Sequence, residues 1–175
     1  MVSMKYNFIC EKRILFNSMA ASPFLLDDLD RRILNALQEN AAQTNNDLAA
    51  SVHASPPTCL RRVKRLIDAG VIERQVAIVA PEKVGPALTA IVEITLDNQA
   101  AERMNDFEAL VANEAAVLQC YRVSPGPDFV LVIQVADMPA YHALAHRLFA
   151  AHANVRNVRS FFSIHRSKFE TRISV

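Results

Sequence analysis

Apolar residues recur at helical spacing in the first half of the chain, and each such stretch follows a helix-start signal. Within residues 27–40 the apolar residues share one helical face. Asp27 with Asp30 has the spacing of a capping box, and Thr44 with Asp47 repeats it. The sequence therefore predicts two helices, one starting at Asp27 and one at Thr44.

A third helix is predicted from Ser55, as the N-cap before Pro56, to a glycine stop at Gly70. A very short turn, His53-Ala54, joins it to the second helix, which is the arrangement of a helix-turn-helix. Three apolar residues of the third helix are expected to face inward: Leu60, Val63 and Ile67.

After Gly70 the period of the pattern changes from helical to alternating, with two further helical stretches. The order β-α-β-β-α-β is that of a ferredoxin-like domain. Both faces of the sheet carry apolar residues, so dimerisation is expected to cover the face without helices. Strands are predicted at Val71–Ala80, Leu88–Leu96, Val117–Val123, Asp128–Val135 and Val155–Ile164, helices at 100–113 and Pro139–His152, and an edge strand at 169–175.

These elements predict an α+β fold, with an N-terminal winged helix-turn-helix and a C-terminal ferredoxin-like βαββαβ domain. Residues 1–22 stand apart and are expected to be a disordered arm or an upstream start extension, with a partner-binding segment as the alternative. Residues 23–75 form the predicted helix-turn-helix domain, 76–86 a linker strand and hinge, and 87–175 the ferredoxin-like domain.

Charge is balanced over the chain but concentrated on the third helix. The chain has 175 residues, with 19 Lys+Arg against 18 Asp+Glu, so it is not a globally basic nucleic-acid binder. A helical rotation of 100° per residue turns Thr58, Arg61 and Arg65 outward, flanked by Arg62 and Lys64. Such side chains can contact phosphates and guanine in the major groove of double-stranded DNA. The predicted DNA contacts are Ser55, Pro57, Thr58, Arg61, Arg62, Lys64 and Arg65.

The sequence gives little support for catalytic, metal-binding or membrane functions. The sequence has no Gly-rich phosphate loop and no Gly-x-Ser-x-Gly, so no catalytic residue and no cofactor are predicted. His142 and His146 have a metal-compatible spacing, but Ala143 stands where a metalloprotease His-Glu-x-x-His motif has glutamate, so they are expected to be helix-surface or dimer-contact residues and no metal is expected. Cys59 and Cys120 are expected to be small buried residues in a reducing cytoplasm. No apolar run is long enough to span a bilayer, so no membrane partner is expected.

Four stretches together resemble one family, the leucine-responsive regulator/asparagine regulator (Lrp/AsnC) family. They are Leu26-Asp27-Asp28-Leu29-Asp30-Arg31-Arg32-Ile33-Leu34, the segment from Ser55 to Leu66 with its Cys-Leu-Arg-Arg-Val core, Val92-Glu93-Ile94-Thr95-Leu96, and Val135 to Tyr141. The resemblance covers roughly residues 26–173. It implies a transcriptional regulator with an amino-acid-sensing domain that forms homodimers and often octamers. The family's usual glycine in the helix-turn-helix turn is replaced here by His53.

The resemblance also implies an effector site where the loop 124–128 meets the last strand, between dimers. The residues carried over are Ser124, Gly126, Asp128 and Ser160. The family's Gly-Asp-x-Asp loop is Pro125-Gly126-Pro127-Asp128 here, which favours apolar amino acids such as leucine or methionine. The alternative is that Asp128 only caps the turn between two strands.

Two other functions share the fold. The chain also resembles sirohaem decarboxylase subunits, in which His146, Arg122 and Arg166 would line a tetrapyrrole site. A ligand-sensing module without DNA binding is the third possibility. The cluster of cations on the third helix favours the DNA-binding function over both.

Overall fold

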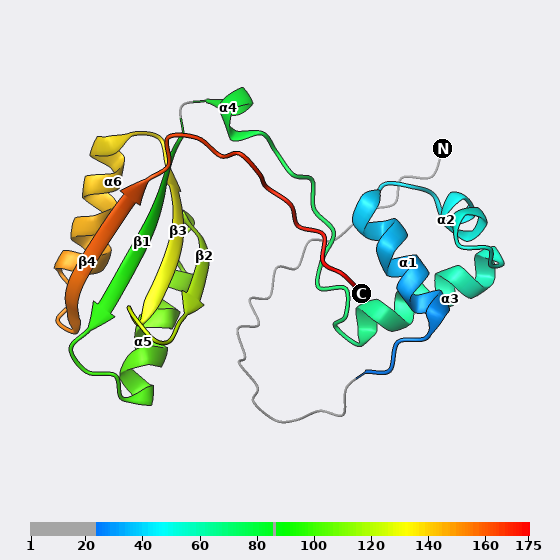
Figure 1. Ribbon diagram of the computed structural model, residues 1–175, viewed down its shortest axis with the longest axis horizontal. Coiled ribbons are helices and arrows are strands. Elements are labelled where there is room, and N and C mark those ends of the chain that lie inside the picture. Colours follow the sequence, from blue (N-terminus) through cyan, green and yellow to red (C-terminus); the bar gives the residue numbers. More distant parts are fainter. Residues whose placement is uncertain (1–23, 86) are drawn as a thin grey trace. The chain divides into compact units, whose positions relative to one another are not determined.

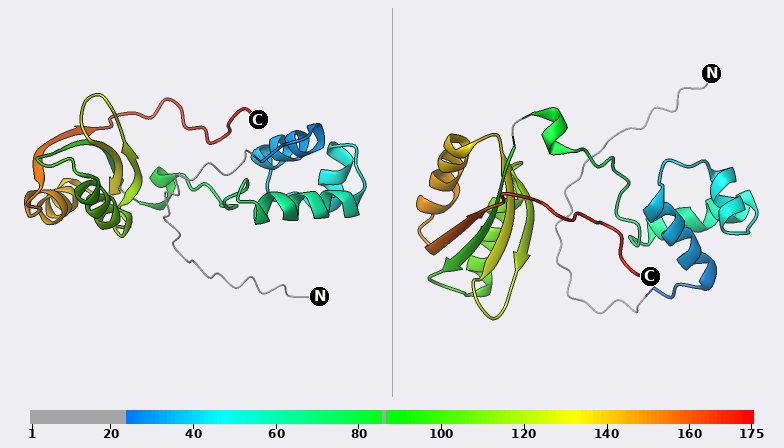
Figure 2. Two further views of the ribbon diagram at one scale, coloured as in Figure 1. Left: turned by 90° about the horizontal axis from the view of Figure 1, so that it is seen from below. Right: turned by 45° about the horizontal axis from the view of Figure 1, so that its top comes forward.

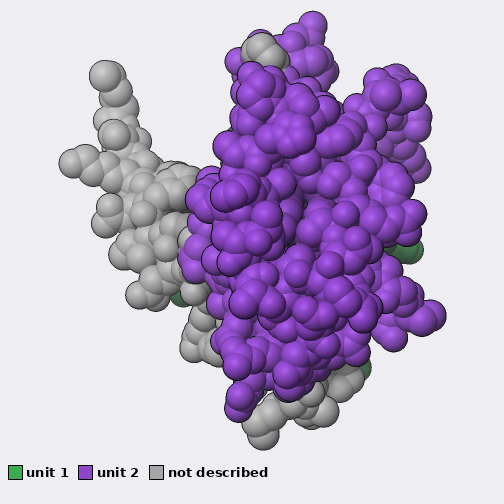
Figure 3. Space-filling model, turned by 90° about the vertical axis from the view of Figure 1, so that its left-hand side faces the viewer, with its two compact units in different colours: residues 1–75, 171–175 green, residues 76–170 purple. Residues whose placement is uncertain are grey.

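The chain forms two compact units, of which Figure 3 shows mainly the second, in purple. The computed structural model describes residues 24–85 and 87–175, so the arm predicted at 1–22 lies outside the described residues. The first unit contains residues 24–75 and 171–175, and we call it the helical unit. The second contains residues 76–170, and we call it the sheet unit.

The helical unit has the three predicted helices (Figure 1): α1 (Asp28–Glu39), α2 (Asn45–Ser51) and α3 (Pro56–Asp68). Both predicted capping boxes are present, and Ser55 is the N-cap of α3. Because the caps satisfy backbone N–H groups locally, they fix where each helix begins. One apolar core joins the helices: Ile33, Leu34, Leu48, Ala49, Val52, Cys59 and Leu66.

The turn between α2 and α3 bends through a backbone conformation that favours glycine. His53 has φ of 53°, and Gly70 at the end of α3 has φ of 71°. A side chain at positive φ is strained, so His53 costs stability where the family's glycine would not. The turn nevertheless keeps the helix-turn-helix geometry.

The rotation of α3 about its axis differs from the prediction. Cys59 and Leu66 are fully buried, whereas Leu60 is 62% exposed and Ile67 is 49% exposed. The expectation that Leu60 and Ile67 face inward was therefore wrong. Arg62 also lies on the inward side of α3. Its side chain is only 20% exposed, because it pairs with carboxylates at the start of α1.

The end of the chain packs against α1 rather than adding a strand. The Gln38 side chain donates to the Ile173 carbonyl at 3.1 Å and accepts from the Ile173 N–H at 2.8 Å. Arg172 pairs with Glu39 at 2.7 Å, and Val175 packs against the core of the helical unit. The edge strand predicted at 169–175 is therefore not formed, because a glutamine side chain takes the place of a neighbouring strand.

The sheet unit follows the predicted β-α-β-β-α-β order, with antiparallel strands arranged β2-β3-β1-β4. A short helix, α4 (Pro81–Val84), precedes it. The elements are β1 (Leu88–Leu96), α5 (Ala101–Ala112), β2 (Val117–Arg122), β3 (Phe129–Val135), α6 (Met138–Ala145) continued by a π-helical turn η1 (His146–Ala150), and β4 (Val155–Phe162). Both α5 and α6 lie on one face of the sheet (Figures 1 and 2). The predicted ferredoxin-like fold is confirmed.

The two faces of the sheet differ in their surroundings. Alternate residues of β1 and β3, such as Val92 and Leu131, are fully buried under the helices. On the opposite face, Phe161, Ile91 and Val132 stand in register across β4, β1 and β3. Phe161 and Ile91 are exposed there. An apolar row therefore crosses three strands on the face of the sheet opposite α5 and α6.

The strand predicted at Val71–Ala80 is not formed. Residues 73–80 have no regular structure, although Val76, Ile78 and Val79 are exposed and strand-like in composition. A strand needs a neighbour to receive its backbone hydrogen bonds, and no strand of the described chain pairs with this segment. Among the described residues no helix combines the length and the apolar character needed to cross a bilayer.

Candidate nucleic-acid interface and ligand loop

The N-terminus of α3 is organised by Ser55. Its hydroxyl accepts from the Thr58 N–H at 3.4 Å and bonds to the Thr58 hydroxyl at 2.8 Å. Pro57 in the first turn is exposed, whereas the Asn45 side chain of α2 donates to the neighbouring Pro56 carbonyl at 2.9 Å. The Pro57 side of the first turn of α3 is therefore open to a partner.

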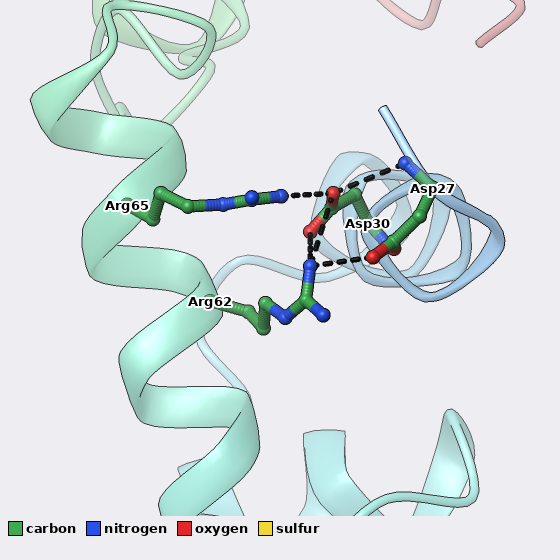
Figure 4. A network of polar contacts seen from close by, with 4 residues as sticks. All are labelled: Asp27, Asp30, Arg62 and Arg65. Atoms are coloured by element: carbon green, nitrogen blue, oxygen red, sulfur yellow. Dashed lines mark hydrogen bonds and ion pairs between the residues drawn. The ribbon is translucent and has the colours of Figure 1, made fainter. Parts of the chain in front are cut away.

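Two arginines of α3 are held by two carboxylates of α1 (Figure 4). Arg62 Nη1 lies 2.6 Å from Asp27 Oδ2 and 3.3 Å from Asp30 Oδ1. Arg65 also pairs with Asp30, and its guanidinium lies 4.9 Å from the centre of the Phe24 ring. Asp30 is fully buried, and its charge is therefore compensated inside the helical unit by both arginines.

The pKa values of the network follow from these contacts. The Asp30 N–H, and after it the Arg62 guanidinium, lower the pKa of the Asp27 carboxyl. The hydrogen bond to Asp27 in turn raises the pKa of Arg62. Both groups are therefore charged at neutral pH, and their charges are paired with each other.

The network divides the predicted DNA contacts into two groups. Arg62 and Arg65 are engaged with α1, although the Arg65 side chain remains 42% exposed. Arg61 and Lys64 are exposed and have no ion-pair partner within residues 24–85 and 87–175. These two cations, with Pro57, lie on the side of α3 opposite Cys59 and Leu66. They form an outward stripe that a polyanion can reach.

In the predicted ligand loop, Asp128 is buried and bonded to its own sheet. Its Oδ2 accepts from the Leu96 N–H at 2.6 Å, and its N–H donates to the Ile94 carbonyl at 2.8 Å. Ser124 and Gly126, at the tip of the loop, are exposed. Asp128 therefore fastens the loop to β1, while the tip of the loop faces outward.

Ser160 lies apart from that loop within one chain. It is opposite Val92 in the register of β1 and β4, and its hydroxyl bonds to the Tyr141 hydroxyl on α6. Because β1 lies between β3 and β4, the loop and Ser160 are separated by about 10 Å across the sheet alone. One subunit does not bring the four predicted effector residues together.

A hollow of about 390 Å³ lies elsewhere in the sheet unit. It is found at the opposite end of β3 from Asp128, between the α4 segment and residues 134–136. Its lining is apolar except for Gln134. Without a charged side chain, this hollow does not match the ammonium and carboxylate of an amino acid.

The remaining chemical candidates show no assembled site. His142 and His146 are exposed on the helix surface, and no cluster of three or more ligand side chains occurs among the described residues. Burial raises the pKa of the Cys59 thiol, and partial desolvation of the sulfur together with the nearby Glu108 carboxylate raises that of Cys120 to about 11, so neither is an activated nucleophile. The expectation that Cys120 is buried was wrong, because it lies exposed on the edge strand β2.

The side chains suggested for a tetrapyrrole have other partners. Arg122 donates to Glu108 at 2.8 Å and to Asn105 at 2.9 Å, both on α5. The guanidinium of Arg166 lies over the Phe169 ring at 4.7 Å. His146 is exposed on the helix surface. None of these contacts favours a shared tetrapyrrole site.

Comparison with known proteins assigns both units. Residues 26–73 match the family model for a winged helix-turn-helix DNA-binding domain. Residues 89–173 match the model for the Lrp/AsnC ligand binding domain. The chain belongs to the Lrp/AsnC family. It is a DNA-binding transcriptional regulator with a ligand-binding domain, as the sequence predicts.

Individual relatives agree over nearly the whole described chain. An uncharacterized HTH-type transcriptional regulator from Haemophilus influenzae is 37% identical over 85% of this chain and 88% of its own length. The crystal structure of an AsnC family transcriptional regulator from Agrobacterium tumefaciens has a TM-score of 0.78 at 34% identity, covering 85% of this chain and 96% of that one. The L-Met complex of a transcriptional regulator from Neisseria meningitidis has a TM-score of 0.77 at 33% identity, covering 86% and 96%.

Proposed function

We propose that this regulator is a cytoplasmic homodimer that binds double-stranded DNA through the outward stripe of α3 and responds to an amino acid. The observation that carries the DNA contact is the exposure of Arg61 and Lys64, two cations without an ion-pair partner among the described residues, beside the open first turn of the recognition helix. In helix-turn-helix proteins the N-terminal residues of this helix contact base edges. Ser55, Pro57 and Thr58 are therefore included in the proposed interface.

The DNA-binding function is tested by a mobility-shift assay of the full chain with a duplex of its own promoter. We expect a specific shift that survives excess unrelated DNA. A visible absorbance scan of the same preparation separates the tetrapyrrole alternative, which requires a strong absorption band. A bound tetrapyrrole without any DNA shift would contradict the proposal.

The dimer is proposed on the open face of the sheet. Burying the apolar row of Phe161, Ile91 and Val132 against a second copy removes from water a surface that one subunit leaves exposed. Because Ile91 is 43% exposed in one subunit, burying the rest of each Ile91 contributes about 1 kcal/mol. Association of dimers into octamers fits the family resemblance and is included in the proposal.

We expect Ile91→Lys to dissociate the dimer, because the twofold axis places two uncompensated charges in one apolar interface. Light scattering at micromolar concentration should then give the mass of one subunit, whereas the parent gives that of a dimer or of an assembly of dimers. Leu110→Lys is the matched control, since Leu110 is an exposed apolar residue on α5, on the helix-covered side. A parent protein that is monomeric, or an Ile91→Lys variant that stays dimeric, contradicts this interface.

The effector site is proposed between dimers, where the loop of one subunit, with Ser124, Gly126 and Asp128, meets Ser160 of another. The separation of these residues within one chain supports a site shared between copies. An amino acid's ammonium needs a carboxylate or carbonyl, and its carboxylate needs N–H or hydroxyl donors. The L-Met complex of the related regulator supports an apolar amino acid, leucine or methionine.

Calorimetric titration with the twenty amino acids tests this site. We expect binding of leucine or methionine, and a loss of about tenfold or more in Asp128→Asn. The asparagine oxygen still accepts from the Leu96 N–H, so this variant removes the charge while keeping the loop fastened. Ser163→Ala, just beyond β4, is the control. If no amino acid binds at millimolar concentration, or if Asp128→Asn binds like the parent, the site assignment is wrong.

A further inference from the structure

An exposed leucine lies among the cations of the recognition helix. Leu60 is 62% exposed, although its neighbour Cys59 and the later Leu66 are fully buried. A single exposed leucine is ordinary on a protein surface, so its exposure alone indicates nothing. Its position does need an explanation, because the surrounding cations can contact DNA phosphates and a large apolar side chain cannot.

Leu60 is the fifth residue of α3, in the half of the helix that faces bases in helix-turn-helix proteins. On a helix, residues three and four apart are surface neighbours, so Leu60 adjoins both Pro57 and Lys64. Arg61 follows it in the sequence and is exposed. Leu60 is therefore flanked by the proposed DNA-contacting residues.

The major groove offers one apolar group to such a side chain. Thymine carries a C5-methyl group there, whereas the other bases present only hydrogen-bonding groups in the canonical code. We propose that Leu60 contacts the methyl group of a thymine and so contributes to the sequence preference of this regulator. This inference rests on the proposed DNA interface of α3, and it adds a base preference that phosphate contacts cannot supply.

Ile67 provides an internal comparison. It is also an exposed apolar residue of α3, 49% exposed and on nearly the same side of the helix as Leu60. It lies seven residues further on, about 10 Å along the axis, in the last turn. Since the recognition helix meets bases near its N-terminus, Ile67 is not expected to reach a thymine.

The test uses a duplex that the full-length protein selects from a randomised pool. Each thymine is then replaced in turn by 2′-deoxyuridine, which differs only in lacking the C5-methyl group. For the parent protein, we expect one such replacement in each half-site to weaken binding about fourfold, the effect of losing one buried methyl-sized group. Leu60→Ala should bind the thymine and deoxyuridine duplexes equally well. Ile67→Ala should keep the fourfold preference.

The results distinguish a failure of the Leu60 contact from a failure of the proposed DNA binding through α3. If the pool yields no enriched duplex, the proposed DNA interface fails and the inference fails with it. If the parent binds the selected duplex but Leu60→Ala still loses fourfold on deoxyuridine, only the role of Leu60 is overturned. Because Leu60 is exposed, we expect its alanine variant to fold like the parent, and circular dichroism checks this.

Discussion

Replacing Asp30 by asparagine is expected to lower the free energy of unfolding of the helical unit by about 3 kcal/mol. Asp30 is fully buried and is shared by Arg62 and Arg65 (Figure 4). The asparagine amide cannot neutralise the two guanidinium groups, and its NH₂ would face their N–H donors. The value is at the lower end of the range for a broken buried ion pair, because both arginines retain some access to water.

The loss should be confined to the helical unit, because the two units have separate apolar cores. Hydrogen exchange read by mass spectrometry resolves peptides of α1 and α3 from those of β1 and β3, so each unit is measured in one sample. We expect faster exchange in the helices of the variant and unchanged exchange in the strands. DNA affinity should fall in parallel, since α3 loses its support.

Asp28→Asn is the matched control for Asp30→Asn. Asp28 lies in the same first turn of α1 and carries the same charge, but it is exposed. Removing it costs only its favourable interaction with the helix dipole, about 0.3–1 kcal/mol. Equal destabilisation by the two variants would show that Asp30 acts through the helix dipole and not through the arginines.

The capped and periodic elements could be predicted because their determinants are local. Asp27 and Asp30, three residues apart, cap α1, and the alternation in β1 places Val92 inward. The ion pairs that rotate α3 were missed because Asp30 and Arg62 are 32 residues apart in the sequence. The matching spacing of Asp27/Asp30 and Arg62/Arg65, three residues in each helix, was the available signal.

Other parts of the structure depend on hydrogen-bond partners from distant elements, which the pattern of apolar and polar residues does not specify. The segment 71–80 has β-branched residues in plenty, yet a strand also requires a neighbour, and the described chain supplies none. The hydroxyl of Ser160 was predicted for an effector, but its partner in one subunit is Tyr141 on another element. In the same way, Asp128 was predicted to contact a ligand or cap a turn, and its bond to the Leu96 N–H is the contact that one subunit makes.

Replacing Arg61 and Lys64 together by alanine is expected to weaken DNA binding about a hundredfold or more at moderate salt and to flatten its salt dependence. If all four cations of α3 contacted phosphates, a dimer would have a slope of log affinity against log salt of roughly −7 from this helix. Because Asp27 and Asp30 compensate Arg62 and Arg65, two cations per subunit remain, and the expected slope from α3 is roughly −4. The double variant should lose this contribution.

Arg65→Ala is the informative comparison, because Arg65 carries the same charge on the same helix but is paired with Asp30. We expect it to lower the stability of the helical unit while leaving the salt slope close to that of the parent. Fluorescence anisotropy at about five salt concentrations between 50 and 400 mM gives the slope for the parent and for the Arg65→Ala variant. If Arg65→Ala flattens the slope by half as much as the Arg61/Lys64 double variant does, then Arg65 leaves Asp30 to bind phosphate, and the division of the α3 cations into paired and free residues is wrong.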